Sequence, residues 1–311
     1  MNPGARRLVL AGLVLLAASE PLRAAQPAPP SQFTLLSGGH PLAVWARVPK
    51  APRAVLVLVH GRTWSSRPDF DLHVPGAGPR SVMASLAARG VAAYAVDLRG
   101  YGATPRDRTG LLSPRQAATD VAAVVQWVSN RHRELPPPAL LGWSLGGAVA
   151  HLTVQQSDVP LSALVLFGYA IEPGARFAAV PVPEAPAMAR TTRADAEADF
   201  ISPLVTPRSV VEAFVQQALA SDPVRMDWVR EEEFNALRGD RLVVPTLVIH
   251  GARDPGMDPG LTARFFASLA APNRQLTVLP GGDHAAQIED THEGFIDAVV
   301  DFLFRPAPAR R

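Results

Sequence analysis

Residues 140–150 constrain the fold of this 311-residue chain more than any other stretch. The stretch reads as the end of an apolar strand, a turn with Ser144 at its apex, and the start of a helix. Gly142 and Gly146 stand two positions to either side, where a strand that reverses sharply into a helix leaves no room for side chains. Such a turn lifts the hydroxyl clear of the sheet, which makes Ser144 a candidate nucleophile. The alternative interpretation is a tight strand-to-helix turn packed on glycine.

Short apolar runs alternate with helical segments along most of the chain. Residues 54–59 and 91–96 are apolar throughout, as expected for strands buried on both faces of a sheet. Two strands over residues 33–36 and 42–48 open the fold, and further strands are expected at 163–167, 242–249 and 275–279. Helices are expected at 81–89, 113–131, 260–269 and 291–304. This alternation predicts the α/β class, with a mostly parallel β-sheet and helices on both faces.

The alternation breaks between residues 168 and 240. This segment contains Pro181, Pro183 and Pro186, and helices are expected near residues 209–219 and 227–237. We interpret it as a helical cap inserted after the sixth strand, over the carboxyl edge of the sheet. The predicted organisation is a signal peptide (1–25), a core (26–167 and 241–304), the cap (168–240) and a flexible tail (305–311).

Residues 1–25 have the features of a secretory signal peptide. Arg6 and Arg7 precede an apolar run of 11 residues, 8–18, which is too short to span a bilayer. Small residues at 17–19 and 24–25 offer two cleavage sites. The alternative is an uncleaved membrane-anchoring helix. We expect an exported protein, periplasmic or secreted, with no stable membrane insertion after removal of the signal.

The scarcity of two residue types excludes several chemistries. Cysteine is absent, which excludes thiol nucleophiles and disulfides. Lys50 is the only lysine and does not adjoin a glycine, so a phosphate-binding loop of the Walker type is excluded. The formal net charge is only +2 and no basic run occurs, so nucleic acid is not an expected partner. Asp69, Asp71 and His73 are of the residue types that bind metals, but an extended loop would point them in alternating directions, so no metal is expected.

A serine hydroxyl is a poor nucleophile unless a base removes its proton and a third group orients that base. In a parallel sheet, these partners should follow the carboxyl ends of later strands, in the order serine, acid, histidine. Asp254 follows the strand that ends at residue 249, and His284 follows the strand that ends at 279. We therefore predict Ser144, Asp254 and His284 as the catalytic residues, with Asp258 and Glu172 as alternative acids.

Other histidines have structural interpretations. His60 and His250 each precede a glycine at a strand end, where a hydrogen bond from the ring would shape the turn. For His284, the structural alternative is a loop histidine bonded to Asp283.

Negative charge develops on the attacked carbonyl oxygen, so hydrogen-bond donors must be preorganised there. The backbone amide of Leu145, directly after the candidate nucleophile, is one expected donor. The second is the amide of Arg62, or alternatively of Thr63, in the loop after the strand at 54–59. Because only the backbone of Arg62 is used, its side chain would be free to contact substrate.

The motifs together resemble those of the α/β-hydrolase fold family, and of its capped, esterase-like serine hydrolases in particular. The resemblance covers residues 33–304 and rests on five short motifs, at residues 60–61, 97–102, 142–147, 251–254 and 282–284. It implies an acyl-transfer enzyme, because relatives that cleave carbon–halogen bonds or epoxides carry aspartate at the position of Ser144. The family usually has glycine before the catalytic histidine, where this chain has Asp283.

The sequence thus predicts an exported serine hydrolase that cleaves a small-molecule carboxylic ester through an acyl-enzyme, without a cofactor. On the same fold, an aminopeptidase-like peptidase or a carbon–carbon bond hydrolase is the alternative. The acidic run at residues 231–233 is a candidate amine anchor for a peptidase, although such runs are commonly solvated helix faces. A non-catalytic binding module is the alternative from a different class. No oligomeric state is predicted.

Overall fold

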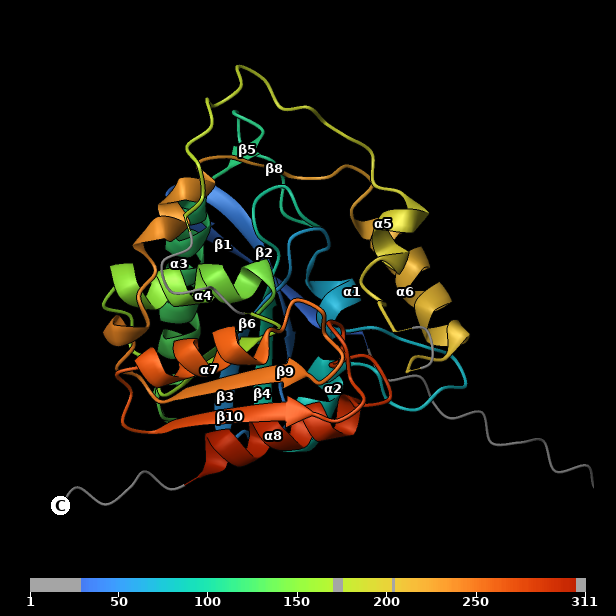
Figure 1. Ribbon diagram of the computed structural model, residues 1–311, viewed down its shortest axis with the longest axis vertical. Coiled ribbons are helices and arrows are strands. Elements are labelled where there is room, and N and C mark those ends of the chain that lie inside the picture. Colours follow the sequence, from blue (N-terminus) through green and yellow to red (C-terminus); the bar gives the residue numbers. More distant parts are fainter. Residues whose placement is uncertain (1–28, 170–175, 203–204, 306–311) are drawn as a thin grey trace, which may run out of the picture.

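The computed structural model describes residues 29–169, 176–202 and 205–305. Its centre is an eight-stranded sheet in the order β1-β2-β4-β3-β6-β7-β9-β10 (Figure 1). The strands are β1 (Ser31–Ser37), β2 (His40–Arg47), β3 (Ala54–Val59), β4 (Val91–Val96), β6 (Ala139–Trp143), β7 (Leu164–Phe167), β9 (Thr246–Gly251) and β10 (Arg274–Leu279). β2 is antiparallel to both β1 and β4, and every other neighbouring pair is parallel. The predicted mostly parallel sheet is confirmed.

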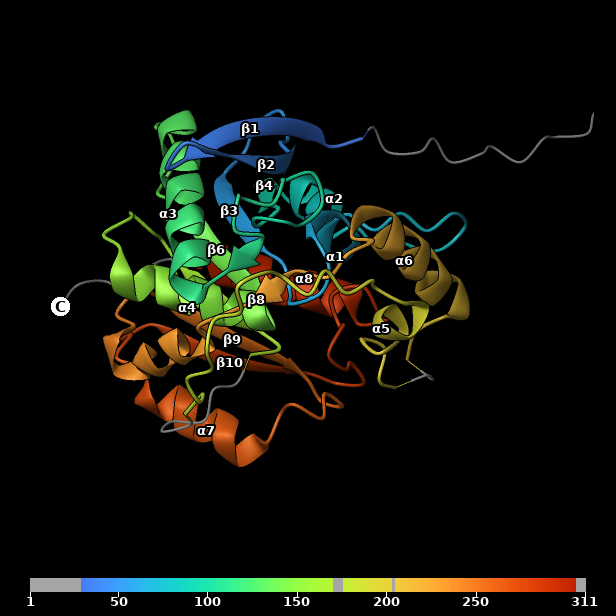
Figure 2. The same cartoon turned by 90° about the horizontal axis from the view of Figure 1, so that it is seen from above.

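Helices cover both faces of this sheet (Figure 2). One face carries α2 (Val82–Ala88) and α8 (His292–Phe304), and the other carries α3 (Pro114–Arg131), α4 (Leu145–Gln156) and α7 (Pro259–Ser268). Along β3, Leu56 and Leu58 pack into the first layer, whereas Val55 and Val57 pack into the second. The continuous apolar run of β3 is explained by this burial on both sides.

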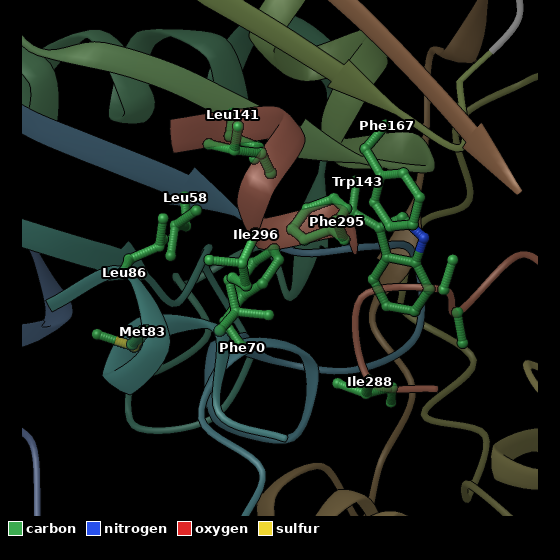
Figure 3. Packing of buried hydrophobic residues seen from close by; sticks show 14 of the residues in the cluster. Leu58, Phe70, Met83, Leu86, Leu141, Trp143, Phe167, Ile288, Phe295 and Ile296 are labelled. Atoms are coloured by element: carbon green, nitrogen blue, oxygen red, sulfur yellow. The ribbon is translucent and has the colours of Figure 1, made fainter. Parts of the chain in front are cut away.

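The hydrophobic cluster that contains Leu58, Phe70 and Ile296 (Figure 3) includes a helix that the sequence did not predict. Helix α1 (Ser66–Phe70) lies in the stretch where the sequence predicts an extended loop. Phe70 is fully buried in the same cluster as Leu58 and Ile296. Its burial anchors the segment that follows β3, which contributes to the candidate site.

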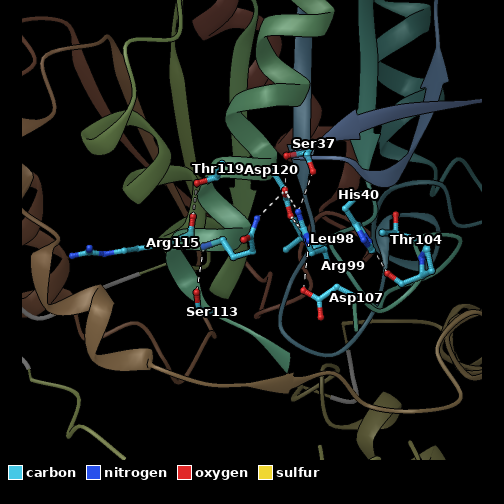
Figure 4. Close-up of polar contacts among 12 residues, drawn as sticks. Ser37, His40, Leu98, Arg99, Thr104, Asp107, Ser113, Arg115, Thr119 and Asp120 are labelled. Carbon is cyan, nitrogen blue, oxygen red and sulfur yellow. Dashed lines mark hydrogen bonds and ion pairs between the residues drawn. The ribbon is translucent and has the colours of Figure 1, made fainter. Parts of the chain in front are cut away.

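A buried ion pair fixes the turn after β4 (Figure 4). Arg99 Nε lies 2.6 Å from Asp120 Oδ2 on α3, and Ser37 Oγ donates to Asp120 Oδ1 at 2.6 Å. The carboxylate of Asp120 is fully buried. A buried charge is tolerated only when it is paired and hydrogen-bonded, as here. The pair ties the first hairpin, the turn and α3 together.

The segment between β7 and β9, here called the inserted segment, is described over residues 176–202 and 205–240. It contains α5 (Arg193–Glu197), α6 (Arg208–Ser221), β8 (Asp227–Trp228), η1 (Glu231–Ala236) and η2 (Gly239–Arg241). In Figure 1 its described stretch before α5 arches over β5 (Leu111–Leu112) and β8, which pair in parallel. Helices α5 and α6 lie to one side of the sheet.

One helix expected in this segment is present and the other is not. The helix expected near residues 209–219 is α6. The prediction of a helix over 227–237 is wrong, because the chain forms the two-residue strand β8 and then the 3₁₀ helix η1. Arg230 between them has φ of 56°, a left-handed conformation that no α-helix contains.

Two predicted segments lie at the ends of the chain. The signal peptide predicted at residues 1–25 lies outside the described residues, as does the tail beyond Arg305. Among the helices of the described part, none is both long and apolar enough to cross a membrane.

Candidate active site

Ser144 occupies the sharp turn expected between β6 and α4. Its φ of 54° and ψ of −122° lie in a region that non-glycine residues rarely adopt. Its amide donates to the carbonyl of Phe167 on β7 at 2.8 Å, and its own carbonyl accepts from Gly147 at 2.9 Å as α4 begins. The strained conformation is therefore held by the neighbouring strand and by the first turn of the helix.

The glycines around Ser144 are required by close backbone contacts. A Cβ atom on Gly142 would lie 2.1 Å from the carbonyl oxygen of Gly146. A Cβ atom on Gly146 would lie 2.3 Å from the carbonyl oxygen of His60, just after β3. The start of α4 is thus pressed against the exit of β3. This contact places the two segments that carry the predicted amide donors, Leu145 and Arg62, next to each other.

His284 and Asp254 meet above the ends of β10 and β9. His284 Nδ1 lies 2.9 Å from Asp254 Oδ2, and Asp254 Oδ1 accepts from the amide of Gly256 at 2.8 Å. The backbone of the histidine is fixed as well, because Trp143 Nε1 donates to its carbonyl at 2.9 Å. At the end of β7, a Cβ atom on Gly168 would lie 3.2 Å from the imidazole Cε1, so this glycine makes room for the ring.

Of the two nearby aspartates, Asp254 is the one that contacts His284. The carboxylate of Asp258 accepts from the amide of Leu261 at 2.7 Å and caps the amino end of α7. The other alternative acid, Glu172, lies outside the described residues.

Asp283 does not form the hydrogen bond to the His284 side chain that was the alternative interpretation of that histidine. It is fully buried, and its carboxylate accepts from the amides of Ser202 at 2.6 Å and Ala285 at 3.1 Å. Its own amide donates to Glu289 Oε2 at 2.8 Å. Burial and the adjacent Asp283 raise the pKa of Glu289 to about 9, so this carboxyl is neutral at pH 7. The residue that replaces the family's glycine thus ties the His284 loop to the inserted segment.

Burial and pairing act in opposite directions on the two groups. Burial by itself lowers the pKa of His284, but the hydrogen bond and charge of Asp254, with Asp199 and Asp283 nearby, raise it overall. Burial by itself raises the pKa of Asp254, but the hydrogen bond and charge of His284 lower it overall. The pair therefore favours a protonated imidazole beside an ionised carboxylate, which is what a base needs after it has taken a proton.

Ser144 and His284 line one small pocket of about 50 Å³. The remaining lining residues come from the loop after β3, α1, the end of β6 and the inserted segment: Gly61, Arg62, Thr63, Trp64, Asp69, Trp143 and Asp199. The structure thus brings Ser144, His284 and Arg62 together, with Asp254 bonded to the histidine and Leu145 next to the serine. Sequence reasoning missed Asp199 altogether, and it named Asp69 only as a metal-ligand candidate.

The histidines at the other two strand ends differ from each other. As predicted, His60 is bonded in its turn, with Nδ1 2.9 Å from the carbonyl of Gly61 and Nε2 accepting from Leu98 at 3.1 Å. The prediction for His250 is wrong, because neither ring nitrogen has a hydrogen-bond partner among the described residues. Burial lowers the pKa of His250 to about 4, so the ring is neutral at pH 7.

The side chain of Arg62 is not free, in contrast to the expectation. Its guanidinium forms a two-point ion pair with Glu231, with one contact of 3.2 Å. Glu233 in the same acidic run accepts from the amide of Arg115 at 2.8 Å, at the start of α3. Two of the three glutamates therefore hold protein groups, and the run is not a purely solvated face.

The two aspartates of the candidate metal cluster bind protein groups instead. Asp69 Oδ2 accepts from the amide of Gly61 at 3.0 Å, and Asp71 is paired with Arg47 at 2.7 Å. In the described ranges, no three histidine, cysteine or acidic side chains are arranged so that they could hold a metal ion.

The sheet order, the serine turn and the bonded histidine after the last strand define the class of α/β-hydrolases. Residues 50–291 match the family model described as serine aminopeptidase, S33, and the chain belongs to this family of serine hydrolases. A monoacylglycerol lipase from Mycolicibacterium smegmatis is 24% identical over 259 residues, which is 81% of this chain and 88% of the lipase.

Solved structures share the fold. An esterase from Rhodococcus sp. superposes with a TM-score of 0.63 at 24% identity, covering 89% of this chain and 98% of the esterase. The thioesterase domain from the curacin biosynthetic pathway gives a TM-score of 0.60 at 18% identity, covering 89% of this chain and all of the domain. Both similarities show that the chain has the α/β-hydrolase fold.

Proposed function

We propose that the protein hydrolyses carboxylic esters through an acyl-enzyme on Ser144. The observation that carries the proposal is the 2.9 Å hydrogen bond from His284 to Asp254, with that histidine and Ser144 on one pocket. The names of the relatives, a monoacylglycerol lipase and several esterases, agree with ester cleavage.

In the proposed reaction, Ser144 Oγ attacks the ester carbonyl while His284 Nε2 takes the hydroxyl proton. Asp254 holds the Nδ1 side of the imidazole and stabilises its positive charge without taking the proton. The amides of Leu145 and Arg62 donate to the carbonyl oxygen as it gains negative charge. His284 then gives its proton to the departing alcohol. Water, deprotonated by the same histidine, finally releases the acid from the serine.

The direct test removes the hydroxyl of Ser144. A Ser144→Ala variant should lose turnover of p-nitrophenyl esters by several orders of magnitude, while its circular dichroism and melting temperature stay those of the parent protein. The parent should also be labelled covalently by a fluorophosphonate, and the variant should not. Full turnover by the variant would refute the proposal, and an unreactive parent would instead indicate a non-catalytic binding module.

Peptide hydrolysis is the second candidate function. Asp199 brings a carboxylate from the inserted segment into the pocket, where it would attract an amino terminus, and the family description names aminopeptidases. Aminoacyl-naphthylamides compared with acyl esters separate the two activities. Carbon–carbon bond hydrolysis would use the same serine and histidine, but no residue of the pocket favours it.

We also propose export of the protein, on the strength of residues 1–18 alone. The amino-terminal sequence of the protein recovered from the periplasm or medium tests this. An intact amino terminus on a cytoplasmic protein would contradict it.

A further inference from the structure

Two carboxyl groups in the pocket have no part in the reaction described above. Asp69 comes from α1 and Asp199 from the inserted segment, just after α5, and both line the pocket with Ser144 and His284. Each is held through one oxygen. Asp199 Oδ2 accepts from the indole of Trp64 at 2.9 Å, and neither aspartate forms an ion pair within the described part of the chain.

Asp69 has an oxygen without a partner. Oδ2 accepts from Gly61 at 3.0 Å, but Oδ1 is buried and has no hydrogen bond among the described residues. The side chain as a whole is fully buried. Buried polar atoms are nearly always paired. Because Asp69 lines the pocket, a molecule bound there is a suitable partner for this oxygen.

Burial raises the pKa of both carboxyl groups. Burial raises the pKa of Asp69 well above its usual value, and nearby carboxylates, Asp199 among them, raise it further, although the bond from Gly61 lowers it. Asp69 therefore holds a proton to higher pH than an ordinary aspartate does. Burial raises the pKa of Asp199 to about 6, with the charge of His284 and the bond from Trp64 acting against this, so Asp199 is mostly ionised at pH 7.5.

We propose that Asp69 and Asp199 form a substrate subsite for a compact hydrogen-bond donor, a hydroxyl or an ammonium group, that the ester carries within a few bonds of its scissile carbonyl. The carboxyl oxygens supply the acceptors that such a donor requires. The volume of about 50 Å³ limits its size, and the shared wall with Ser144 fixes its distance from the reacting carbonyl. This inference rests on the ester hydrolysis proposed above.

The subsite predicts a ranking among four esters of nearly equal size. They are p-nitrophenyl esters of the form X–CH₂–CH₂–CO, where X is hydroxyl, ammonium, methyl or carboxylate. At pH 7.5, kcat/KM should be about tenfold higher for the better of the two donor esters than for the methyl ester. The carboxylate ester should be the poorest, because Asp199 repels it. The order of the hydroxyl and ammonium esters identifies whether the natural donor is a neutral alcohol or a cation.

Isosteric variants test whether the two aspartates cause this ranking. In Asp69→Asn and Asp199→Asn, the amide oxygen can still accept from Gly61 or Trp64, while an NH₂ group that only donates faces the pocket. The ratio of kcat/KM between the donor ester and the methyl ester should fall to about one in each variant. Asp222→Asn is the matched control. Asp222 belongs to the same group of buried carboxyls, but it accepts from the amides of Ser65 and Gly102 and does not line the pocket.

In the control, the ratio should remain that of the parent even if the melting temperature falls. Equal rates for the donor and methyl esters in the parent protein would overturn the subsite, and so would asparagine variants that slow all four esters by one factor. Absence of turnover for all four esters would instead refute the ester hydrolysis itself, and the subsite with it.

Discussion

Replacing Gly146 by alanine tests the claim that the turn around Ser144 is set by steric contact. The added Cβ would lie 2.3 Å from the carbonyl oxygen of His60 and 2.4 Å from that of Val59, whereas ordinary contacts begin at 3.4 Å. Both obstacles are backbone atoms of the chain leaving β3, so neither can rotate away as a side chain would. We therefore expect the start of α4 to move by about 1 Å.

The cost follows from these distances. Overpacking a core typically costs about 1–3 kcal/mol, and two backbone clashes place Gly146→Ala at the upper end, about 3 kcal/mol. At about 2–4 °C per kcal/mol for a domain of this size, the melting temperature should fall by roughly 6–12 °C. The shift also moves the amide of Leu145, and loss of one such donor lowers kcat by about 10²–10³-fold.

Thermal unfolding followed by circular dichroism and the kcat for p-nitrophenyl butyrate measure the two effects. Gly78→Ala is the matched control, because no atom lies within 4 Å of its added Cβ and its φ is not positive. Its melting temperature should stay within about 2 °C of the parent. A Gly146→Ala protein with the melting temperature and kcat of the parent would refute the steric explanation of the motif.

Three further predictions follow from the charges. Because His284 must be neutral to act as base and its pKa is raised, kcat/KM should rise with pH through an apparent pKa above the usual value of about 6.5; a pH–rate profile that rises below 6 would contradict this. In Asp254→Asn, the charge of Asp254 no longer offsets the lowering of the His284 pKa by burial, so the rise of kcat/KM with pH should move to lower pH, and kcat should fall by about 10⁴-fold. A rise at the same pH as in the parent would show that Asp254 does not raise the pKa of His284. Asp120→Asn should cost about 3–5 kcal/mol in urea unfolding, since it removes the fully buried partner of Arg99 and leaves the guanidinium only the longer ion-pair contact to Asp107, at 3.6 Å. Asp240→Asn at an exposed pair should leave the midpoint unchanged.

Most of the sheet could be predicted because its strands are buried on both faces. The run at residues 91–96 matches β4 at both ends, and the pair of strands predicted before residue 50 is β1 and β2. Short elements could not be found in this way. Helix α1 has only five residues, too few to show a helical period, and it is stabilised by the burial of Phe70 in a distant core.

The candidate catalytic residues could be predicted from the sequence because of the topology of the sheet. Parallel strands end at one edge, so the residues that follow three of them must come close together whatever the helices do. This topology is sufficient to predict that Asp254 lies close to His284, and that both lie at the edge of the sheet where Ser144 is found. It says nothing about Asp199, because that residue reaches the pocket from the inserted segment, whose path depends on contacts and not on periodicity.

Two of those contacts link the inserted segment to the site. Trp64, in the loop that is predicted to carry an oxyanion donor, holds Asp199 at 2.9 Å, and Asp283, next to His284, holds the amide of Ser202 at 2.6 Å. The inserted segment is thus attached on one side to the loop after β3 and on the other to the histidine loop. A chain with glycine in place of Asp283 would lack the second attachment. The substrate range of this protein should therefore depend on residues 199–202 as much as on the core that carries the reaction.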